Sequence, residues 1–338
     1  MIGVGLIGYG YWGPNLARNF ARSRDAKLVC VADADTRRLE AAKRDWPDVE
    51  VTSSADILIE RPDIEAVIIA TPTATHFPLA RQALLHNKHV WIEKPLCDNV
   101  QDAERLVQEA ERRNRILLVD HTFVYTEAVR WMQNYVHSGE LGELYYIDSI
   151  RANLGLFQRD VSVLWDLAPH DLSIFGAVIG RSPVSVRAIG ACHAGSRMPD
   201  IAYLDLDYGD SILAHLHVSW LSPVKVRRTV IGGSKRMMVF DDLAPVEKVK
   251  VYDSGVSIQS GESGPENGYR MLVEYRVGDM LSPALKSTEA LATEVAHFLH
   301  CIRNGEQPAT GGRAGLEVVR ILAAAQQSME SDGERVRI

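Results

Sequence analysis

Hydrophobic residues follow two alternating patterns over the first 120 positions of the chain. Short runs rich in β-branched residues are apolar without interruption, and between them lie segments whose apolar residues recur at helical spacing. Strands buried on both faces need continuous apolar runs, and strands that alternate with helices form parallel sheets. The pattern predicts strands at 2–7, 28–32, 49–52, 66–70, 90–92 and 116–119, and helices at 12–23, 36–45, 75–86 and 100–113.

The pattern changes after about residue 123. A helical stretch at 127–138 leads into runs that alternate apolar and polar residues, such as LYYIDSIRAN and SILAHLHVSW, separated by turn residues. Such alternation is typical of an antiparallel sheet with one face in water. Residues 255–268, rich in Gly and Ser, are expected to form a loop, and helices are expected at 288–303 and 312–329.

The two patterns predict two domains, because 338 residues exceed what one hydrophobic core usually serves. We expect an α/β protein in which residues 1–122 form a doubly wound parallel sheet. Residues 123–338 are expected to form a second α/β domain around a large, mostly antiparallel open sheet. The composition, 46% apolar and 24% charged, is that of an ordinary globular chain.

Charge and targeting signals narrow the function classes. The net charge of −7, with acids and bases interspersed, offers no basic surface for nucleic acid or membrane. No apolar stretch reaches about 18 residues and no signal peptide is recognisable, so a cytoplasmic protein is expected. The 4 cysteines lie far apart, and His215 and His217 share a strand face without a third ligand, so no metal site is predicted.

The sequence GYGYWG at 8–13 has the GxGxxG spacing of a phosphate-binding turn and stands between a predicted strand and a predicted helix. Its glycines allow a tight turn and close approach to a pyrophosphate, and the helix N-terminus attracts phosphate. Asp33 ends the second strand, where a carboxylate can bind a ribose diol and repel a 2′-phosphate. NAD is therefore expected rather than NADP, although Arg37 and Arg38 would soften that preference. The alternative is a turn with an incidental acid.

Polar residues follow three successive strands of the predicted sheet. ATPTATH follows the fourth strand, EKP the fifth, and Asp120-His121 the sixth. Ligands of open parallel sheets collect at these carboxyl ends. Thr71, Thr73 and His76 could instead cap the following helix. The residues expected to contact the cofactor are Gly8, Gly10, Tyr11, Trp12, Gly13, Asp33, Arg38, Thr71, Pro72, Thr73, His76, Glu93 and Lys94.

A second motif, WDLAPHD at 165–171, lies in the other predicted domain. Pro169 is tolerated only in the first turn of a helix, so a helix is expected to begin near Asp166. Asp166 and His170 then share one face, and the helix N-terminus would keep the imidazole neutral. Alternatively, Asp166 is only an N-cap and His170 only a satisfied polar residue.

Together these residues supply what an alcohol dehydrogenase needs. Oxidation of a secondary alcohol transfers a hydride to a nicotinamide and a proton to a base, and a cation near the oxygen stabilises the developing charge. His170 can be the base, Asp166 its orienting partner and Lys94 the cation.

GYGYWG, ATPTATH, EKP and the DxxxH of DLAPHD occur in an order that resembles the glucose–fructose oxidoreductase, inositol dehydrogenase and rhizopine-catabolism (Gfo/Idh/MocA) oxidoreductases over essentially the full chain. The resemblance implies a Rossmann domain that binds NAD, followed by a domain whose open sheet serves substrate binding and oligomerisation. A homo-oligomer, a dimer or a tetramer, is therefore expected. It also implies the catalytic set Lys94, Asp166 and His170, and a cis Lys94–Pro95 peptide.

GYWGPNLARNF, VDHTFVYT and SWLSPVKVRR are similar to the nucleotide-sugar branch of that family. The branch oxidises the C3 hydroxyl of UDP-linked N-acetylhexosamines such as UDP-N-acetylglucosamine. The keto sugar then feeds an aminotransferase in the synthesis of lipid A or surface polysaccharide. A UDP-sugar needs cations for its diphosphate and hydrogen bonds for its sugar. The residues expected to contact it are Lys94, Tyr125, Asn153, Gln158, Arg159, His170, Lys225 and Arg227, although several could simply be solvated.

Two other functions fit the same residues. A dehydrogenase of inositol or another free polyol would use the same catalytic set and ignore the UDP group. A non-catalytic regulator of the same fold would bind the dinucleotide only. Such regulators lose the lysine and the histidine, and this chain retains both.

Overall fold

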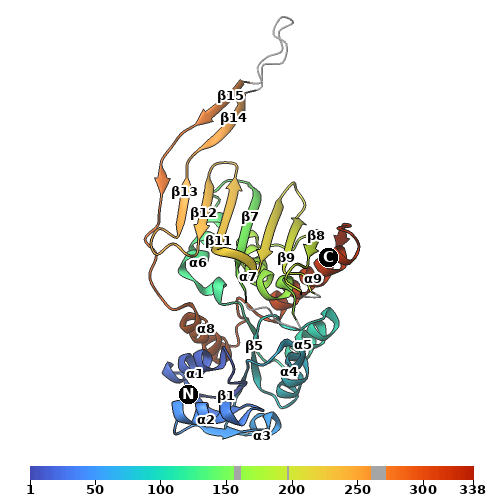
Figure 1. The fold of residues 1–338 in the computed structure, drawn as a ribbon. Helices are drawn as coiled ribbons and strands as arrows, with labels where there is room; N and C mark the ends of the chain where they lie inside the picture. Colours follow the sequence, from blue (N-terminus) through green and yellow to red (C-terminus); the bar gives the residue numbers. More distant parts are fainter. Residues whose placement is uncertain (156–160, 196–197, 260–271) are drawn as a thin grey trace, which may run out of the picture.

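The chain forms two lobes, each built around its own sheet; in Figure 1 the elements coloured blue to cyan lie in one lobe and the long strands coloured green to orange lie in the other. The structure is a computed structural model, and it describes residues 1–155, 161–195, 198–259 and 272–338. Within these ranges no helix has both the length and the apolar composition to cross a bilayer.

The first sheet has six strands in the order β3-β2-β1-β4-β5-β6, and every neighbouring pair is parallel. The chain starts at the centre and winds outward in both directions, as in a doubly wound fold. β1 (Ile2–Ile7) and β4 (Ala66–Ile69) are buried along their whole length because helices cover both faces. The other strands are β2 (Ala26–Ala32), β3 (Glu50–Thr52), β5 (His89–Glu93) and β6 (Leu117–Asp120); the helices are α1 (Gly13–Arg22), α2 (Thr36–Asp45), α3 (Ala55–Glu60), α4 (His76–Leu85) and α5 (Val100–Arg112).

The second sheet has nine strands in the order β16-β13-β12-β11-β7-β10-β9-β8-β17. β10 (Leu213–Ser219) and β7 (Leu144–Leu154) run parallel, and the other neighbouring pairs are antiparallel. The prediction of a large, mostly antiparallel sheet is confirmed. The remaining strands are β8 (Ser185–Ala191), β9 (Ile201–Asp207), β11 (Leu221–Gly233), β12 (Met237–Asp241), β13 (Val249–Tyr252), β16 (Met280–Leu281) and β17 (Val336–Arg337).

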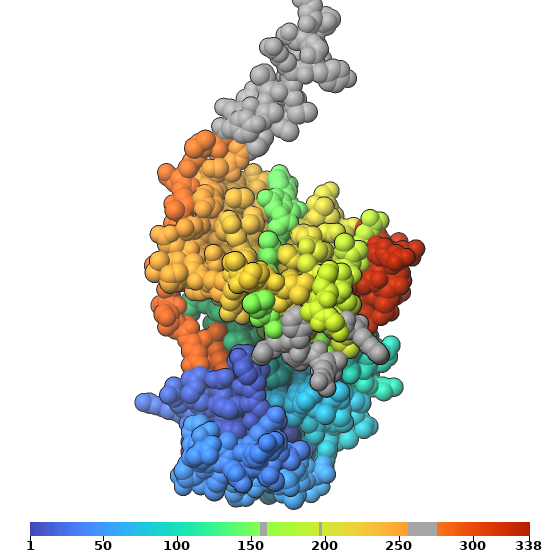
Figure 2. All heavy atoms as spheres, in the orientation of Figure 1, coloured from blue at the N-terminus to red at the C-terminus, as the bar shows by residue number. Residues whose placement is uncertain are grey.

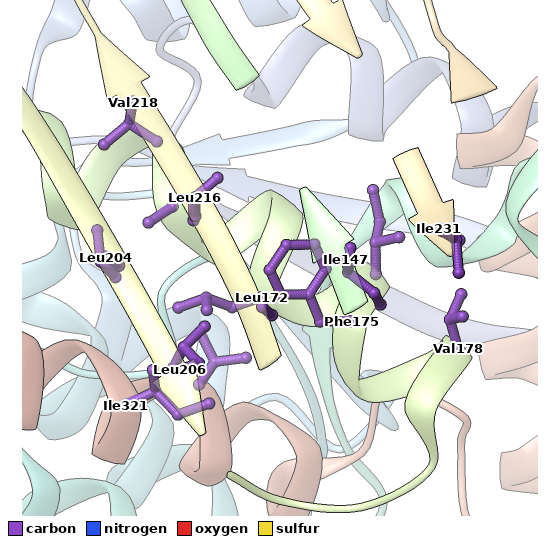
Figure 3. Packing of buried hydrophobic residues seen from close by; sticks show 14 of the residues in the cluster. Ile147, Leu172, Phe175, Val178, Leu204, Leu206, Leu216, Val218, Ile231 and Ile321 are labelled. Atoms are coloured by element: carbon purple, nitrogen blue, oxygen red, sulfur yellow. The ribbon is translucent and has the colours of Figure 1, made fainter. Parts of the chain in front are cut away.

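One face of the second sheet is covered by helices. Figure 3 shows Leu172 and Phe175, from α7 (Val163–Ile179), among side chains of the strands, including Leu216. α9 (Gly312–Glu330) packs on β8 and α7, and Figure 2 shows the end of the chain against the same edge. α6 (Glu127–His137) packs on α7. Each of these buried leucines or phenylalanines contributes about 1.5–3 kcal/mol.

The last helices return to the first lobe. α8 (Ala290–Asn304) lies beside α1, as Figure 1 shows, and Phe298 is fully buried there. Its ring centroid is 5.5 Å from that of Trp91 and 6.3 Å from that of Phe20. The core of the first sheet therefore includes a segment from the far end of the chain, and the division at residue 122 stays a prediction.

One expected loop is partly a strand. Residues Gly255–Gln259 form β14, which pairs with β15 (Leu272–Arg276) as a separate two-stranded sheet. The sequence GVSIQ alternates small or polar residues with β-branched ones, a strand pattern that the flanking Gly and Ser obscured. Residues 260–268 of that expected loop lie outside the described residues.

Candidate active site

The phosphate-binding turn at 8–13 joins β1 to α1 at the carboxyl edge of the first sheet. Gly8 has a φ of 96°, and a Cβ there would lie 2.4 Å from the carbonyl oxygen of Ala70. A Cβ on Gly13 would lie 2.4 Å from the carbonyl oxygen of Gly8, so the helix start packs directly on the strand end. A Cβ on Gly10 would meet nothing nearer than Arg38, at 3.5 Å, which leaves the turn open to a pyrophosphate.

Asp33 follows β2 beside this turn and is 7% exposed. Its carboxylate accepts a hydrogen bond from the backbone N–H of Tyr9 at 2.7 Å, and Arg38 Nη1 lies 3.6 Å from Oδ2. Asp33, Arg38, Thr71 and Pro72 border a cavity of about 390 Å³. The cavity, the carboxylate and the open turn fit the adenosine and pyrophosphate of NAD, as predicted from GxGxxG and the following acid.

His76 joins two of the strand-end loops. Its Nδ1 lies 2.9 Å from the carbonyl oxygen of Pro95, and its Nε2 lies 2.9 Å from the carbonyl oxygen of Thr71. Burial lowers the pKa of His76. The ring thus links the loop after β4, which holds cofactor candidates, to the loop after β5, which begins at Lys94, and its nitrogens face backbone rather than the cofactor. Thr75 precedes α4 without a side-chain capping bond, and Thr73 borders a second cavity with Pro95.

The other expected cofactor contacts differ in exposure. Tyr11 and Trp12 are 79% and 44% exposed and meet edge to face, with centroids 5.4 Å apart, so they are free to cover a bound dinucleotide. Glu93 is instead buried beside Asp120, its pairing partner on β6, and close enough to Glu294 of α8 for their charges to interact. Burial, followed by the charge of Asp120, raises the pKa of Glu93 well above its usual range. Glu93 therefore belongs to a buried carboxyl group cluster rather than to the open cofactor surface.

Lys94 stands at the end of β5, and its peptide bond to Pro95 is cis. Its ammonium donates to Oδ1 of Asp166 at 3.0 Å and to the carbonyl oxygen of Asp166 at 2.7 Å. Both side chains are mostly buried, 14% and 21% exposed. The structure therefore brings the EKP motif and the WDLAPHD motif together at the junction of the two lobes, although Lys94 and Asp166 are 72 positions apart.

Asp166 is held by Lys94 and by Trp220, whose indole N–H donates to Oδ2 at 3.2 Å. The prediction that Asp166 orients His170 is wrong, because within the described residues the carboxylate bonds these two partners and not the imidazole. The reason is the direction of side chains on a helix. They lean toward its N-terminus, so a short aspartate reaches back and not toward the residue four positions later.

The second motif also lies deeper in its helix than predicted. α7 begins at Val163, so Pro169 stands inside it. A proline has no N–H to bond the carbonyl four positions earlier, so Pro169 leaves the carbonyl of Trp165 without its helical partner. The carbonyl of Asp166 in this turn accepts the Lys94 ammonium. Because His170 lies beyond the first turn, the helix N-terminus is not what keeps its ring neutral.

His170 is half-buried against Phe123, with ring centroids 5.1 Å apart at 72°. Its Nδ1 is buried without a hydrogen-bond partner among the described residues, which leaves Nε2 as the nitrogen for a substrate. Burial, then the charges of Lys94 and Arg151, hold the pKa of His170 well below its usual range. The ring is therefore neutral, as predicted, for a different reason.

Two arginines near His170 complete the site. Arg151 is buried, pairs with Asp171, and places its guanidinium carbon 4.6 Å from the centroid of Phe123. The guanidinium carbon of Arg227 lies 5.6 Å from the same centroid, and its Nη1 lies 3.1 Å from Oδ2 of Asp242. The sequence analysis missed Arg151. The sequence could have indicated this residue, because the other buried positions of its strand, β7, carry apolar or small side chains.

The remaining expected substrate contacts scatter. Tyr125 is a core residue, 1% exposed, whose hydroxyl bonds Thr310 Oγ1 at 2.9 Å, so it does not face a substrate. Asn153 is half-buried on β7, two positions after Arg151, and Lys225 is exposed on β11. Gln158 and Arg159 lie outside the described residues.

The histidines of the open sheet face are paired with other side chains. His215 Nδ1 lies 2.7 Å from Oδ1 of Asp205, and His217 stacks on Tyr203 with centroids 4.5 Å apart. Among the residues that the structure describes, no three His, Cys, Asp or Glu side chains are grouped so that they could hold a metal ion.

Comparison with protein families finds matches to both halves of the chain. Residues 2–121 match the oxidoreductase family with an NAD-binding Rossmann fold. Residues 129–239 match the GFO/IDH/MocA C-terminal domain. Together the two matches cover more than half of the 338 residues.

Relatives with different activities match the chain over nearly its full length. The chain is 28% identical to the UDP-N-acetylglucosamine 3-dehydrogenase of Acidithiobacillus ferrooxidans, over 96% of this chain and 95% of that protein. It is 24% identical to the myo-inositol 2-dehydrogenase of Thermotoga maritima, over 97% and 96%. A solved structure of the Acidithiobacillus enzyme superposes with a TM-score of 0.80 at 25% identity, covering 99% of this chain and all of that one.

Proposed function

The chain belongs to the Gfo/Idh/MocA oxidoreductase family, which acts on CH–OH groups with a nicotinamide cofactor, and we propose that it oxidises the C3 hydroxyl of a UDP-linked N-acetylhexosamine. UDP-N-acetylglucosamine is the proposed substrate and its 3-keto derivative the product. The observation that carries a catalytic role is the contact between Lys94 and Asp166, one helical turn from His170. The similarity to UDP-N-acetylglucosamine 3-dehydrogenase over nearly the full length supports the choice of sugar.

The chain's own groups perform the acid–base part of the reaction. When bound, NAD accepts the hydride from the carbinol carbon. A lysine ammonium has three donors, and two of those on Lys94 are used by Asp166, so the third is left for the substrate oxygen. That contact strengthens as negative charge develops on the oxygen. Nε2 of the neutral His170 accepts the hydroxyl proton.

The substrate's diphosphate needs positive charge beyond the catalytic groups. The guanidinium carbon of Arg227 lies 5.6 Å from the centroid of the Phe123 ring, which also contacts His170, but the ion pair of Arg227 with Asp242 already offsets part of its charge. Lys225 is exposed on β11, two positions before Arg227, and Asn153 is the proposed hydrogen-bond partner of the sugar. Arg159 and Gln158 remain candidates from the sequence alone.

We further propose a place in metabolism and an assembly. A 3-keto sugar is the substrate of an aminotransferase, so the product would feed the synthesis of an amino-sugar lipid A or surface polysaccharide in the cytoplasm. The uncovered face of the second sheet carries the exposed apolar residues Ile189, Tyr203 and Leu213. An exposed apolar sheet face is a candidate surface for self-association. We assign it to a homo-oligomer.

The second candidate function is oxidation of a free polyol. The similarity to myo-inositol 2-dehydrogenase favours it, because that relative also matches the whole chain. The catalytic set would serve either substrate, since both present a secondary alcohol. The difference lies in the groups that contact the UDP.

The test is formation of NADH by the purified protein with UDP-N-acetylglucosamine, UDP-glucose and myo-inositol in parallel. The proposal expects turnover of the UDP-N-acetylhexosamine and competitive inhibition by UDP alone. Turnover of myo-inositol that UDP does not inhibit would favour the polyol dehydrogenase. Turnover of any of these substrates by Lys94→Ala at the wild-type rate would remove the catalytic assignment.

A further inference from the structure

The catalytic base lacks the hydrogen bond that usually fixes such a ring. A histidine that works through one ring nitrogen commonly has the other nitrogen held by a carboxylate or a carbonyl, which sets the tautomer. Nδ1 of His170 is buried without a hydrogen-bond partner among the described residues. The carboxylate of Asp166 bonds Lys94 and Trp220 instead. The orientation of this imidazole is therefore left to packing.

The aromatic ring that packs on the imidazole belongs to Phe123. The two ring centroids are 5.1 Å apart and the ring planes meet at 72°, an edge-to-face contact. Such contacts have a preferred geometry, so a fixed phenyl ring favours one direction of the imidazole. Phe123 lies in the short helix η2 (Thr122–Tyr125), which packs on α7. The direction of the His170 ring thus depends on what fixes Phe123.

Two arginines contact the Phe123 ring. The guanidinium carbons of Arg151 and Arg227 lie 4.6 Å and 5.6 Å from its centroid, within the range of a cation–π contact. The two arginines are also directly opposite each other in the β7–β11 pair. Like charges in such positions destabilise a sheet unless they are compensated. Asp171 pairs with Arg151. In the same way, Asp242 pairs with Arg227.

Arg151 is the more firmly held of the two arginines. Its side chain is 4% exposed, whereas that of Arg227 is 30% exposed. Nε of Arg151 donates to Oδ2 of Asp171, and Oδ1 of the same carboxylate accepts a hydrogen bond from Ser149 at 2.8 Å. Ser149 lies two positions before Arg151 on β7. Both carboxylate oxygens are therefore bound to one strand, which holds the pair in place.

These contacts form a closed set around the base. Arg151 contacts the ring of Phe123, and that ring contacts His170. Asp171 follows His170 in α7 and returns to Arg151. A strand, a short helix and a long helix are thereby joined at the catalytic imidazole. A buried ion pair is often no more stabilising than apolar residues of the same volume, so stability alone does not account for Arg151.

We propose that Arg151 is a positioning residue for the catalytic base and acts through Phe123. Its guanidinium, held by Asp171, fixes the phenyl ring, and the ring holds the imidazole of His170 with Nε2 toward the substrate hydroxyl. The inference rests on the proposed dehydrogenase function, which gives the orientation of His170 its purpose. A displacement of about 1 Å can cost a reaction on the order of 10²-fold, because proton transfer needs the two heavy atoms within hydrogen-bond reach.

The first test is structural and needs no turnover. Crystal structures of the full chain are compared for the wild type and for Arg151→Met/Asp171→Asn. Replacing both members of the pair avoids a buried carboxylate without its cation and leaves the net charge unchanged. The wild type should show one orientation of the His170 ring, edge to face with Phe123. The variant should show that ring rotated or in several orientations.

Two results of the structural test would overturn the proposal. One is a His170 ring that keeps a single, unchanged orientation in the variant, and the other is a ring with several orientations in the wild type. If the buried pair cannot be replaced without unfolding, the structure of Phe123→Leu decides, because it changes only a half-buried side chain. The test stands even if the protein oxidises none of the substrates named above, an outcome that would remove the proposed function alone.

The second test is a double-mutant cycle on kcat. Arg151→Met/Asp171→Asn should lower kcat about tenfold, a fraction of the 10²–10⁴-fold that a general base contributes, and should change KM by less than about threefold. Phe123→Leu, which removes the ring and keeps an apolar side chain, should lower kcat to a similar extent. Because Arg151 acts through that ring, the triple variant should be within about twofold of Phe123→Leu.

Arg236→Met is the matched control. Arg236 also places its guanidinium carbon over an aromatic ring, 6.0 Å from the centroid of Tyr135, and also pairs with a carboxylate, that of Glu140 at 3.1 Å. Its replacement should leave kcat within about twofold of wild type. Losses that multiply in the triple variant would overturn the proposal, and so would a wild-type kcat in Phe123→Leu. Circular dichroism confirms that each compared variant is folded.

Discussion

Lys94 Nζ lies 3.0 Å from Oδ1 of Asp166 and 2.7 Å from its carbonyl oxygen, so a strand end of the first lobe is tied to a helix of the second. The contact uses two of the three ammonium donors and aims the third. Through this contact the EKP and WDLAPHD motifs lie in a single site.

Replacing Lys94 tests that site directly. Lys94→Ala should reduce kcat/KM by about 10²–10³-fold, because it removes the cation that we propose stabilises the developing alkoxide. Asp166→Asn should cost less, since the lysine and the backbone carbonyl it bonds both remain. Steady-state kinetics of both variants, measured with whichever of the three substrates the wild-type protein oxidises, checks these expectations. A larger loss in Asp166→Asn than in Lys94→Ala would contradict the assigned roles.

Trp220 should act on the reaction through Asp166. Trp220→Phe removes the indole N–H that bonds Oδ2, a bond to a charged group worth on the order of 1.5 kcal/mol, so kcat should fall about tenfold. Trp131→Phe is the matched control, because Trp131 stacks on Tyr135 instead. The kcat of Trp220→Phe is compared with that of Trp131→Phe, and equal values would refute a positioning role for Trp220.

The acid beside the phosphate turn should set cofactor preference. Asp33→Asn removes the charge that repels a 2′-phosphate while an oxygen remains to accept the N–H of Tyr9. The ratio of kcat/KM for NAD to that for NADP should fall. Arg38→Ala should raise the ratio, because Arg38 lies 3.6 Å from the carboxylate and could bind the added phosphate. No change in either variant would remove both residues from the cofactor site.

Acid should destabilise the protein through its buried histidines. An unfolded histidine has a pKa near 6.5, and the pKa of His121 in the fold is about 3. As pH falls, His121 is protonated in the unfolded chain before it is protonated in the fold. The contribution of neutral His121 to the free energy of unfolding is therefore complete above about pH 6.5 and is lost as pH falls toward 3. At pH 5 the loss is about 2 kcal/mol. His121→Phe should narrow the drop in Tm between pH 7 and pH 5, and the exposed His86→Phe should not.

The uncovered sheet face should control assembly. Leu213→Glu and Ile189→Glu place charges on side chains that are 58% and 59% exposed, so they should reduce the oligomer to smaller species without unfolding it. Light scattering after size exclusion measures the mass. Ile57→Glu on α3 changes an equally exposed isoleucine elsewhere and should leave the mass unchanged.

Local patterns of the sequence predicted the first sheet, the phosphate turn and the strand ends, because their causes are local. Continuous apolar runs mark strands buried on both faces, and Gly8 and Gly13 stand where a Cβ would strike backbone. The pairing of Lys94 with the Asp166 motif was reached only by adding the family resemblance to the required chemistry.

What the sequence could not provide depends on contacts between distant segments. Trp220 and Asp166 are 54 positions apart, and no spacing rule links an indole to a carboxylate. Tyr125 has the polar tip of a substrate contact, yet its hydroxyl is satisfied by Thr310, 185 positions away. The start of α7 was misplaced because an interior proline costs a helix about 3 kcal/mol and was therefore expected only in the first turn, whereas α7 contains Pro169 in its interior.

The return of α8 to the first lobe has a practical consequence for dissecting this protein. A fragment ending near residue 122 would leave Trp91 and Phe20 facing solvent where Phe298 now covers them. Truncating Phe298 alone should cost about 3–5 kcal/mol. The dinucleotide-binding unit is therefore discontinuous along the polypeptide, and a minimal version would have to graft residues 290–304 back onto the N-terminal portion.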